Sequence, residues 1–120
     1  MMQFVRQEAM VGPSDAEPII ALEDASKSFP TADGAIDALR SITLAVGNGE
    51  ILAVVGSSGC GKSTLLRLIA GLLPATSGDI RVKGRRVAGP DEGIGMVFQT
   101  PVLLPWRSVR RNIELQLDAR

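Results

Sequence analysis

One segment of the sequence has residue types and spacing that could bind the phosphates of a nucleotide. Residues 56–64 read GSSGCGKST and satisfy the pattern G-x-x-x-x-G-K-[ST]. Glycines in such a loop let successive backbone N–H groups face phosphate oxygens, and the helix that follows adds a partial positive charge. We expect Lys62 to reach the β and γ phosphates and the Ser63 hydroxyl to ligate Mg²⁺. The expected nucleotide-binding residues are Gly56, Ser57, Ser58, Gly59, Cys60, Gly61, Lys62, Ser63 and Thr64.

The alternative for this loop is a glycine-rich turn before a helix, with Lys62 merely solvated. The sequence context favours the phosphate-binding interpretation, because an apolar run precedes the loop and a helical pattern follows it. Cys60 has an ordinary interpretation as a small residue that the loop tolerates. Its place predicts that alkylation of Cys60 blocks nucleotide binding and that ATP protects the thiol.

Composition and charge narrow the possible functions of the chain. The 120 residues suit one domain, and 13 basic residues balance 13 acidic ones, so charge does not indicate a nucleic-acid partner. A single cysteine and no histidine leave no internal disulfide and remove the commonest metal ligand and general base. No run approaches the roughly 18 apolar residues of a membrane-spanning helix, and residues 1–17 lack a secretory pattern. We therefore expect an intracellular chain whose membrane association goes through a partner.

A strand and a helix must position the phosphate-binding loop. Residues 51–55, ILAVV, are apolar at every position, which predicts a central parallel strand covered on both faces. After the loop, apolar residues recur at helical spacing at Leu65, Leu68, Ile69 and Leu72. This pattern predicts a largely buried helix that ends near Gly71 and Pro74.

The remaining pattern divides the chain into a poorly ordered leader, residues 1–17, and one domain, residues 18–120. Residues 18–29 and 35–46 alternate as half-buried antiparallel strands do, and we interpret 19–24 as an edge strand. Further expected elements are a strand, a Gly84 turn and a strand over 76–87, an extended run over 94–98, and a helix capped by Ser108 that bears Val109, Ile113 and Leu117.

Several segments besides the loop occur in the order found in ABC transporter ATPases, and the chain resembles the front half of that family's domain. LEDASKSF at 22–29 resembles the first strand of the family, and GPDEGIGMVFQ at 89–99 resembles the segment that leads into its Q-loop. TPVLLPWRSVRRNIEL at 100–115 resembles the corresponding stretch of nitrate, sulfonate and taurine importers. The resemblance covers essentially residues 18–120.

The resemblance implies a fold and two further site residues. The implied fold is α/β, an incomplete P-loop NTPase (RecA-like) core with an N-terminal antiparallel β-subdomain of the ABC ATPase type. Phe29 would stack on adenine, the alternative being a core phenylalanine. Gln99 would touch Mg²⁺ or the attacking water, which makes Lys62 and Gln99 the expected catalytic residues and Ser63 and Gln99 the expected metal ligands. The apolar loop around Trp106 would dock a helix of another subunit, the alternative being packing in this domain's own core.

The resemblance also implies cofactors and partners. They are ATP, Mg²⁺, a transmembrane permease subunit, a second copy of the ATPase and, indirectly, a periplasmic solute-binding protein, with no nucleic acid. The protein would lie peripherally on the cytoplasmic face of the inner membrane. The chain has no LSGGQ-type signature, no apolar strand ending in Asp-Glu after Gln99 (the Walker B strand) and no switch histidine. We therefore expect the 120-residue chain alone to bind nucleotide at best weakly and to be inactive as an ATPase.

Other functions compatible with the loop remain as alternatives. A small nucleotide kinase needs a lid and substrate arginines, and a GTPase usually carries Asn-Lys-x-Asp, neither of which occurs in the sequence. A catalytically silent nucleotide-binding fragment and a non-transport ABC ATPase remain open. The LLPWRSV stretch, residues 103–109, argues against the latter.

Overall fold

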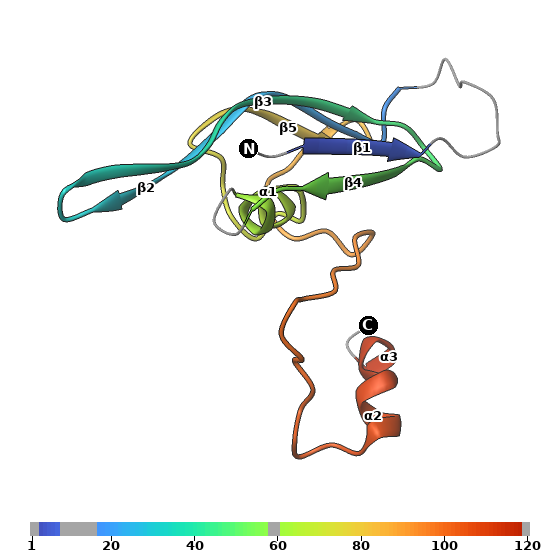
Figure 1. Cartoon of the computed structure of the whole chain (residues 1–120). Coiled ribbons are helices and arrows are strands. Elements are labelled where there is room, and N and C mark those ends of the chain that lie inside the picture. Colours follow the sequence, from blue (N-terminus) through green and yellow to red (C-terminus); the bar gives the residue numbers. More distant parts are fainter. Residues whose placement is uncertain (1–2, 8–16, 58–60, 119–120) are drawn as a thin grey trace.

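A computed structural model describes residues 3–7, 17–57 and 61–118 of the chain. In Figure 1 two antiparallel β-sheets lie above a helix, and the last part of the chain extends away from them to a short helical end. The elements are β1 (Gln3–Gln7), β2 (Ile20–Thr31), β3 (Gly34–Val46), β4 (Ile51–Val55), α1 (Lys62–Ile69), β5 (Ser77–Val82), β6 (Arg85–Arg86), α2 (Val109–Ile113) and α3 (Leu115–Asp118). Within the described ranges, no helix is both long and apolar enough to cross a membrane.

The larger sheet has the strand order β3-β2-β5-β6 and confirms most of the predicted strands. β2 and β3 form a long hairpin that closes at the pair Thr31 and Gly34, where the Thr31 hydroxyl donates to the Gly34 carbonyl at 2.7 Å. β5 and β6 are joined by Lys83 and Gly84, both at positive φ (54° and 76°), which is the turn predicted at Gly84.

The prediction that residues 19–24 form an edge strand is wrong. β2 lies between two neighbours, because Ile20 pairs with Val46 of β3 on one side and with Val82 of β5 on the other. The alternation of apolar residues along β2 reports which face is buried, but it carries no information about a partner strand that comes from beyond α1. The second neighbour therefore could not be read from the local pattern.

The core lies between the larger sheet and one face of α1. Leu65 and Leu68 of α1 are completely buried against sheet residues such as Leu22, Leu39 and Ile80. The opposite face of the helix is open, since Leu66 remains 49% exposed. The helix is therefore buried on one face, less completely than its run of leucines predicts. Its C-terminal end is closed by Gly71 at φ 78°, as predicted.

β4 forms as predicted but with an unexpected partner. It pairs antiparallel with β1, from Gln3 opposite Val55 to Gln7 opposite Ile51. Leu52 and Val54 pack against the core, whereas the side chains at the two ends of β4 are exposed. A parallel neighbour would have to return through a crossover connection. No described segment after α1 pairs with β4 in parallel. The strand predicted to be central and parallel is instead one of the two antiparallel strands of the smaller sheet.

β1 also differs from the predicted leader. Residues 3–7 belong to the stretch 1–17 that the sequence marks as poorly ordered, yet their backbone pairs with β4. Pairing of this kind uses backbone N–H and C=O groups, and it therefore leaves little mark on the sequence. Residues 8–16 lie outside the described part of the chain.

The C-terminal segment confirms the predicted cap, and the extended run predicted over 94–98 forms no strand. Residues 94–98 have no strand partner in the described part of the chain. Ser108 caps α2, because its Oγ accepts from the Arg111 backbone N–H at 3.2 Å. The Asn112 side chain accepts from the Leu104 N–H at 2.8 Å and donates to the Leu104 carbonyl at 3.2 Å, which fastens the preceding loop to α2. The predicted helix is interrupted at Glu114, which lies between the end of α2 at Ile113 and the start of α3 at Leu115.

Candidate functional site

The connection between β4 and α1 places the phosphate-loop motif at the start of the helix. Gly61 precedes the first helical residue at φ 97°, and the Leu65 N–H donates to the Gly61 carbonyl at 2.9 Å. Ser58, Gly59 and Cys60, which are predicted phosphate contacts, lie outside the described residues. The described part of the motif is therefore Gly56, Ser57 and Gly61 through Thr64.

Gly61 lies against the backbone of β3. A Cβ atom at this position would lie 2.5 Å from the Ala38 carbonyl oxygen and 2.7 Å from Leu39 Cδ2. Both the positive φ and this close approach require glycine. The start of α1, and with it Lys62 and Ser63, is thus held at a fixed place on the larger sheet.

The Lys62 ammonium group folds back onto the loop. It donates to the Ser57 carbonyl at 3.0 Å and also to the Gly56 carbonyl. Both acceptors are neutral carbonyl oxygens, so these contacts leave the positive charge uncompensated and able to attract an anion. A phosphate group that approached the loop would compete with these two carbonyls for the ammonium group.

Three of the predicted site residues line one cavity. This cavity has a volume of about 660 Å³ and is bounded by β4, by the first turns of α1 and by residues 96–102. Lys62, Ser63 and Gln99 all line it, although Gln99 is more than 30 positions further along the chain. Arg67, one helical turn after Ser63, and Thr100 line it as well. The fold therefore brings together two cations, two hydroxyl groups and one carboxamide.

These residue types fit a magnesium–phosphate ligand. Mg²⁺ prefers oxygen ligands and commonly keeps several waters and phosphate oxygens beside one or two protein groups. The Ser63 hydroxyl and the Gln99 amide oxygen are suitable protein ligands, and Lys62 and Arg67 can neutralise phosphate charge. Among the described residues no group of three or more cysteine and acidic side chains could hold a metal ion.

Phe29 lies apart from this cavity, near the end of β2. It pairs with Ile36 of β3, the residue is 36% exposed, and the Lys27 ammonium group lies 5.2 Å from the ring centroid. This exposure does not fit the alternative of a core phenylalanine. The ring remains accessible to a planar ligand, and stacking on adenine stays a prediction.

Sequence reasoning missed Arg67 and Thr100 as cavity residues. Arg67 interrupts the apolar face of α1 four residues after Ser63, and that spacing places both side chains on one face of the helix. This signal was available in the sequence. Thr100 directly follows Gln99 and had no signal of its own. Thr64 lies in the first turn of α1 but does not line the cavity.

The proline-punctuated loop around Trp106 does not pack into the core of the described chain. Trp106 is 75% exposed and Leu103 is 70% exposed, while Leu104 is half-buried beside Asn112. The alternative that these side chains fill this domain's own core is therefore not supported within the described residues. Their docking to another subunit remains a prediction.

Comparison with known proteins identifies related sequences. The family model described as ABC transporter matches residues 39–120. The nitrate import ATP-binding protein NrtD of Synechocystis sp. is 48% identical over 98 residues, which are 82% of this chain and 37% of that protein. The taurine import ATP-binding protein TauB of Burkholderia pseudomallei is 44% identical over 98 residues, 82% of this chain and 38% of that protein. The chain thus spans less than half the length of these relatives.

The fold has solved counterparts. The ATP-binding cassette MJ0796, described as a dimer in a post-hydrolysis state bound to ADP and Pi, superimposes with a TM-score of 0.67 at 26% identity. The match covers 83% of this chain and 47% of that chain. It confirms the predicted fold class, an incomplete P-loop NTPase with an N-terminal antiparallel β-subdomain. Because the family model also matches most of the sequence, the chain belongs to the ABC transporter family.

Proposed function

We propose that the intact protein is the ATP-binding subunit of a bacterial ABC importer that couples ATP binding and hydrolysis to solute uptake. The observation that carries this proposal is the single cavity shared by Lys62, Ser63 and Gln99 at the start of α1. Three of the relatives are named as import ATP-binding proteins for nitrate, taurine and aliphatic sulfonates. These names support a solute of the nitrate, sulfonate or taurine type.

Each site residue has a role in this proposal. The loop amides and Lys62 hold the triphosphate, Phe29 stacks on adenine, and Ser63 and Gln99 supply oxygen ligands for Mg²⁺. When bound, Mg²⁺ neutralises charge on the phosphates. Gln99 also orients the attacking water. Phosphoryl transfer depends mainly on such positioning and charge stabilisation, which is why the placement of Lys62 and Gln99 on one cavity matters.

The proposed partners are a transmembrane permease subunit, a second copy of the ATPase and, indirectly, a periplasmic solute-binding protein. The protein would be peripheral on the cytoplasmic face of the inner membrane. The dimer described for MJ0796 supports the second copy. The exposed Leu103 and Trp106 support an apolar contact with the permease. Balanced charge gives no support to a nucleic-acid partner.

The second candidate function is nucleotide binding without turnover. It is favoured by the sequence of residues 1–120, which has no LSGGQ-type segment and no histidine. We propose on this basis that these 120 residues alone are inactive. Steady ATP hydrolysis by the 120-residue chain, abolished by Lys62→Ala, would contradict that proposal. Hydrolysis by the protein expressed as its gene encodes it distinguishes the two candidate functions.

Substitution of Ser63 tests the assigned magnesium ligand. Ser63→Ala is expected to weaken ATP binding in Mg²⁺ about tenfold, because one charge-assisted contact is lost. In EDTA the variant and the unaltered protein should bind ATP alike. Titration calorimetry with ATP in both buffers measures this difference. The matched control is Ser77→Ala at the start of β5, a residue that does not line the cavity. An equal loss in EDTA would contradict the role in metal binding.

A further inference from the structure

The end of β2 that carries Phe29 extends beyond one of its two neighbouring strands. The pairing between β2 and β5 ends at Ser26 opposite Ser77, whereas the pairing with β3 continues to Thr31. Between Leu22 and Ser28 the register of β2 against β3 shifts three times. In the part of the chain that the structure describes, residues 27–31 therefore have no strand partner on the β5 side, and they follow an irregular part of β2.

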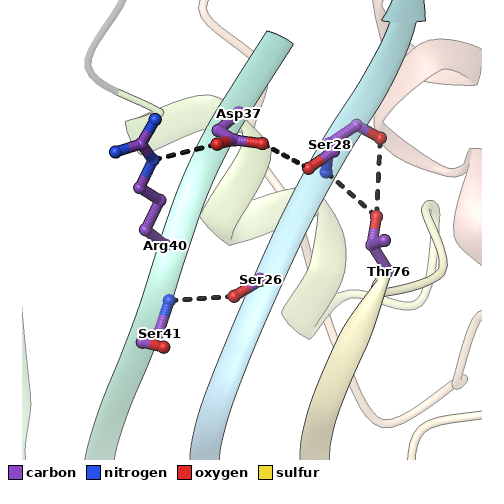
Figure 2. A network of polar contacts seen from close by, with 6 residues as sticks. All are labelled: Ser26, Ser28, Asp37, Arg40, Ser41 and Thr76. Atoms are coloured by element: carbon purple, nitrogen blue, oxygen red, sulfur yellow. Dashed lines mark hydrogen bonds and ion pairs between the residues drawn. The ribbon is translucent and has the colours of Figure 1, made fainter. Parts of the chain in front are cut away.

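The hydroxyl group of Thr76 supplies the missing contact on the β5 side. Thr76 immediately precedes β5, and its backbone N–H donates to the Ser26 carbonyl at 2.8 Å. Its Oγ1 accepts from the Ser28 backbone N–H at 2.9 Å and lies 3.4 Å from the Ser28 carbonyl oxygen, to which it can donate. Figure 2 shows Thr76 beside Ser28 on this side of the strand. One side chain thus continues the hydrogen-bonding pattern of the strand by one step.

The β3 side of Ser28 is held as well. The Ser28 hydroxyl donates to Asp37 Oδ1 at 2.6 Å, and Arg40 Nε donates to Asp37 Oδ2 at 3.0 Å (Figure 2). The hydrogen bond from Ser28, together with the charge of Arg40, lowers the pKa of Asp37 below its usual value. The carboxylate therefore stays ionised at neutral pH and accepts both hydrogen bonds. Ser28 is clamped between two strands, and Phe29 is the next residue.

We infer that Thr76 is a positioning residue for Phe29, and that it fixes the backbone at Ser28 so that the aromatic ring meets the base of a bound nucleotide. This inference rests on the proposed function, in which Phe29 stacks on adenine. Thr76 lies in the connection that leaves α1, the helix that begins with Lys62. Its hydroxyl therefore links the element that holds the phosphates to the strand that holds the base, over 48 positions of sequence.

The test compares ATP with inorganic triphosphate, which has no base, as ligands of the protein expressed as its gene encodes it. Phe29→Ala is expected to weaken ATP binding about 5- to 150-fold, the range for loss of one base–aromatic stack. Thr76→Val is expected to weaken ATP binding about fivefold, as loss of one ordinary hydrogen bond would. Neither variant should change the affinity for triphosphate, because neither residue contacts phosphate. Thr76→Ser, which keeps the hydroxyl, should restore ATP binding.

Two further variants separate positioning from a general loss of stability. The control is Thr43→Val, since the Thr43 hydroxyl also accepts from a backbone N–H of β2, that of Asp24 at 3.1 Å, five residues before Phe29. It should leave the ratio of ATP to triphosphate affinity unchanged. The double variant Phe29→Ala with Thr76→Val should bind ATP no more weakly than Phe29→Ala alone, because Thr76 acts through the ring.

The outcomes distinguish the inference from the function on which it rests. Additive losses in the double variant, equal effects of Thr76→Val and Thr43→Val, or no effect of Phe29→Ala would each overturn the role of Thr76 and leave nucleotide binding intact. If the unaltered protein shows no magnesium-dependent affinity for ATP, or if Lys62→Ala leaves that affinity unchanged, the proposed function and the inference both fail.

Discussion

Lys62→Ala is expected to lower ATP hydrolysis by the intact protein on the order of 10²–10³-fold, the loss typical of removing one group that stabilises charge in a transition state. The Lys62 ammonium group contacts the described part of the phosphate loop, since it donates to the Ser57 carbonyl at 3.0 Å. Alanine removes the positive charge that would stabilise the β and γ phosphates. Steady-state release of phosphate from saturating ATP measures the effect.

The matched control for this substitution is Lys83→Ala. Lys83 lies in the turn between β5 and β6 and does not line the cavity of Lys62, Ser63 and Gln99. Hydrolysis should therefore stay close to that of the unaltered protein. A calorimetric titration with ATP separates loss of binding from loss of turnover. Undiminished turnover by Lys62→Ala would contradict the assignment of residues 56–64 as the phosphate site.

The predictable parts of the fold are those that local sequence determines. Alternating apolar residues specified β2 and β3, Gly84 specified the turn after β5, and the hydroxyl of Ser108 specified the start of α2. The phosphate loop was predictable because its pattern occurs between a strand and a helix. Each of these signals depends on side chains within a few positions of one another.

The parts that could not be predicted depend on partners distant in the sequence. Whether β2 has one neighbour or two depends on β5, which returns only after α1. β1 pairs with β4 through backbone N–H and C=O groups. Nearly every residue type carries these groups, so the pairing could not be predicted from the residue types. Likewise residues 94–98 have a strand-like sequence, but the described part of the chain offers them no neighbouring strand. A strand-like pattern thus indicates a capacity to pair, whereas pairing needs a partner edge.

The same reason explains which parts of the site were visible in the sequence. Lys62 and Ser63 belong to one contiguous motif, and Gln99 was found by resemblance. The approach of Gln99 to the other two across the cavity is a product of the fold. Thr76 gave no signal, because its hydroxyl acts on Ser28 from 48 positions away. Contacts of this kind become visible only when the two chain segments are seen side by side.

Gly61→Ala is expected to lower the free energy of unfolding by roughly 2–5 kcal/mol. Of this loss, about 1–2 kcal/mol would come from placing a Cβ atom at left-handed φ, and about 1–3 kcal/mol from crowding in a packed region. The crowding has a defined source, since the new Cβ would lie 2.5 Å from the Ala38 carbonyl oxygen. Typical domains have only about 5–15 kcal/mol of stability, so this is a large fraction. Urea unfolding followed by far-UV circular dichroism measures the change.

Two other glycines separate the contributions at Gly61. Gly34 has φ 123°, and a Cβ atom added there would meet no atom within 4 Å, so Gly34→Ala reports backbone strain without crowding. Gly95→Ala has neither problem and should change stability by less than about 0.5 kcal/mol. All three substitutions restrict the unfolded chain alike, so that effect cancels in the comparison. If Gly61→Ala costs no more than Gly34→Ala, the close approach of α1 to β3 is not what holds Lys62 and Ser63 in place. If it costs more and ATP affinity falls with it, the packing of α1 on β3 is what sets the geometry of the phosphate site.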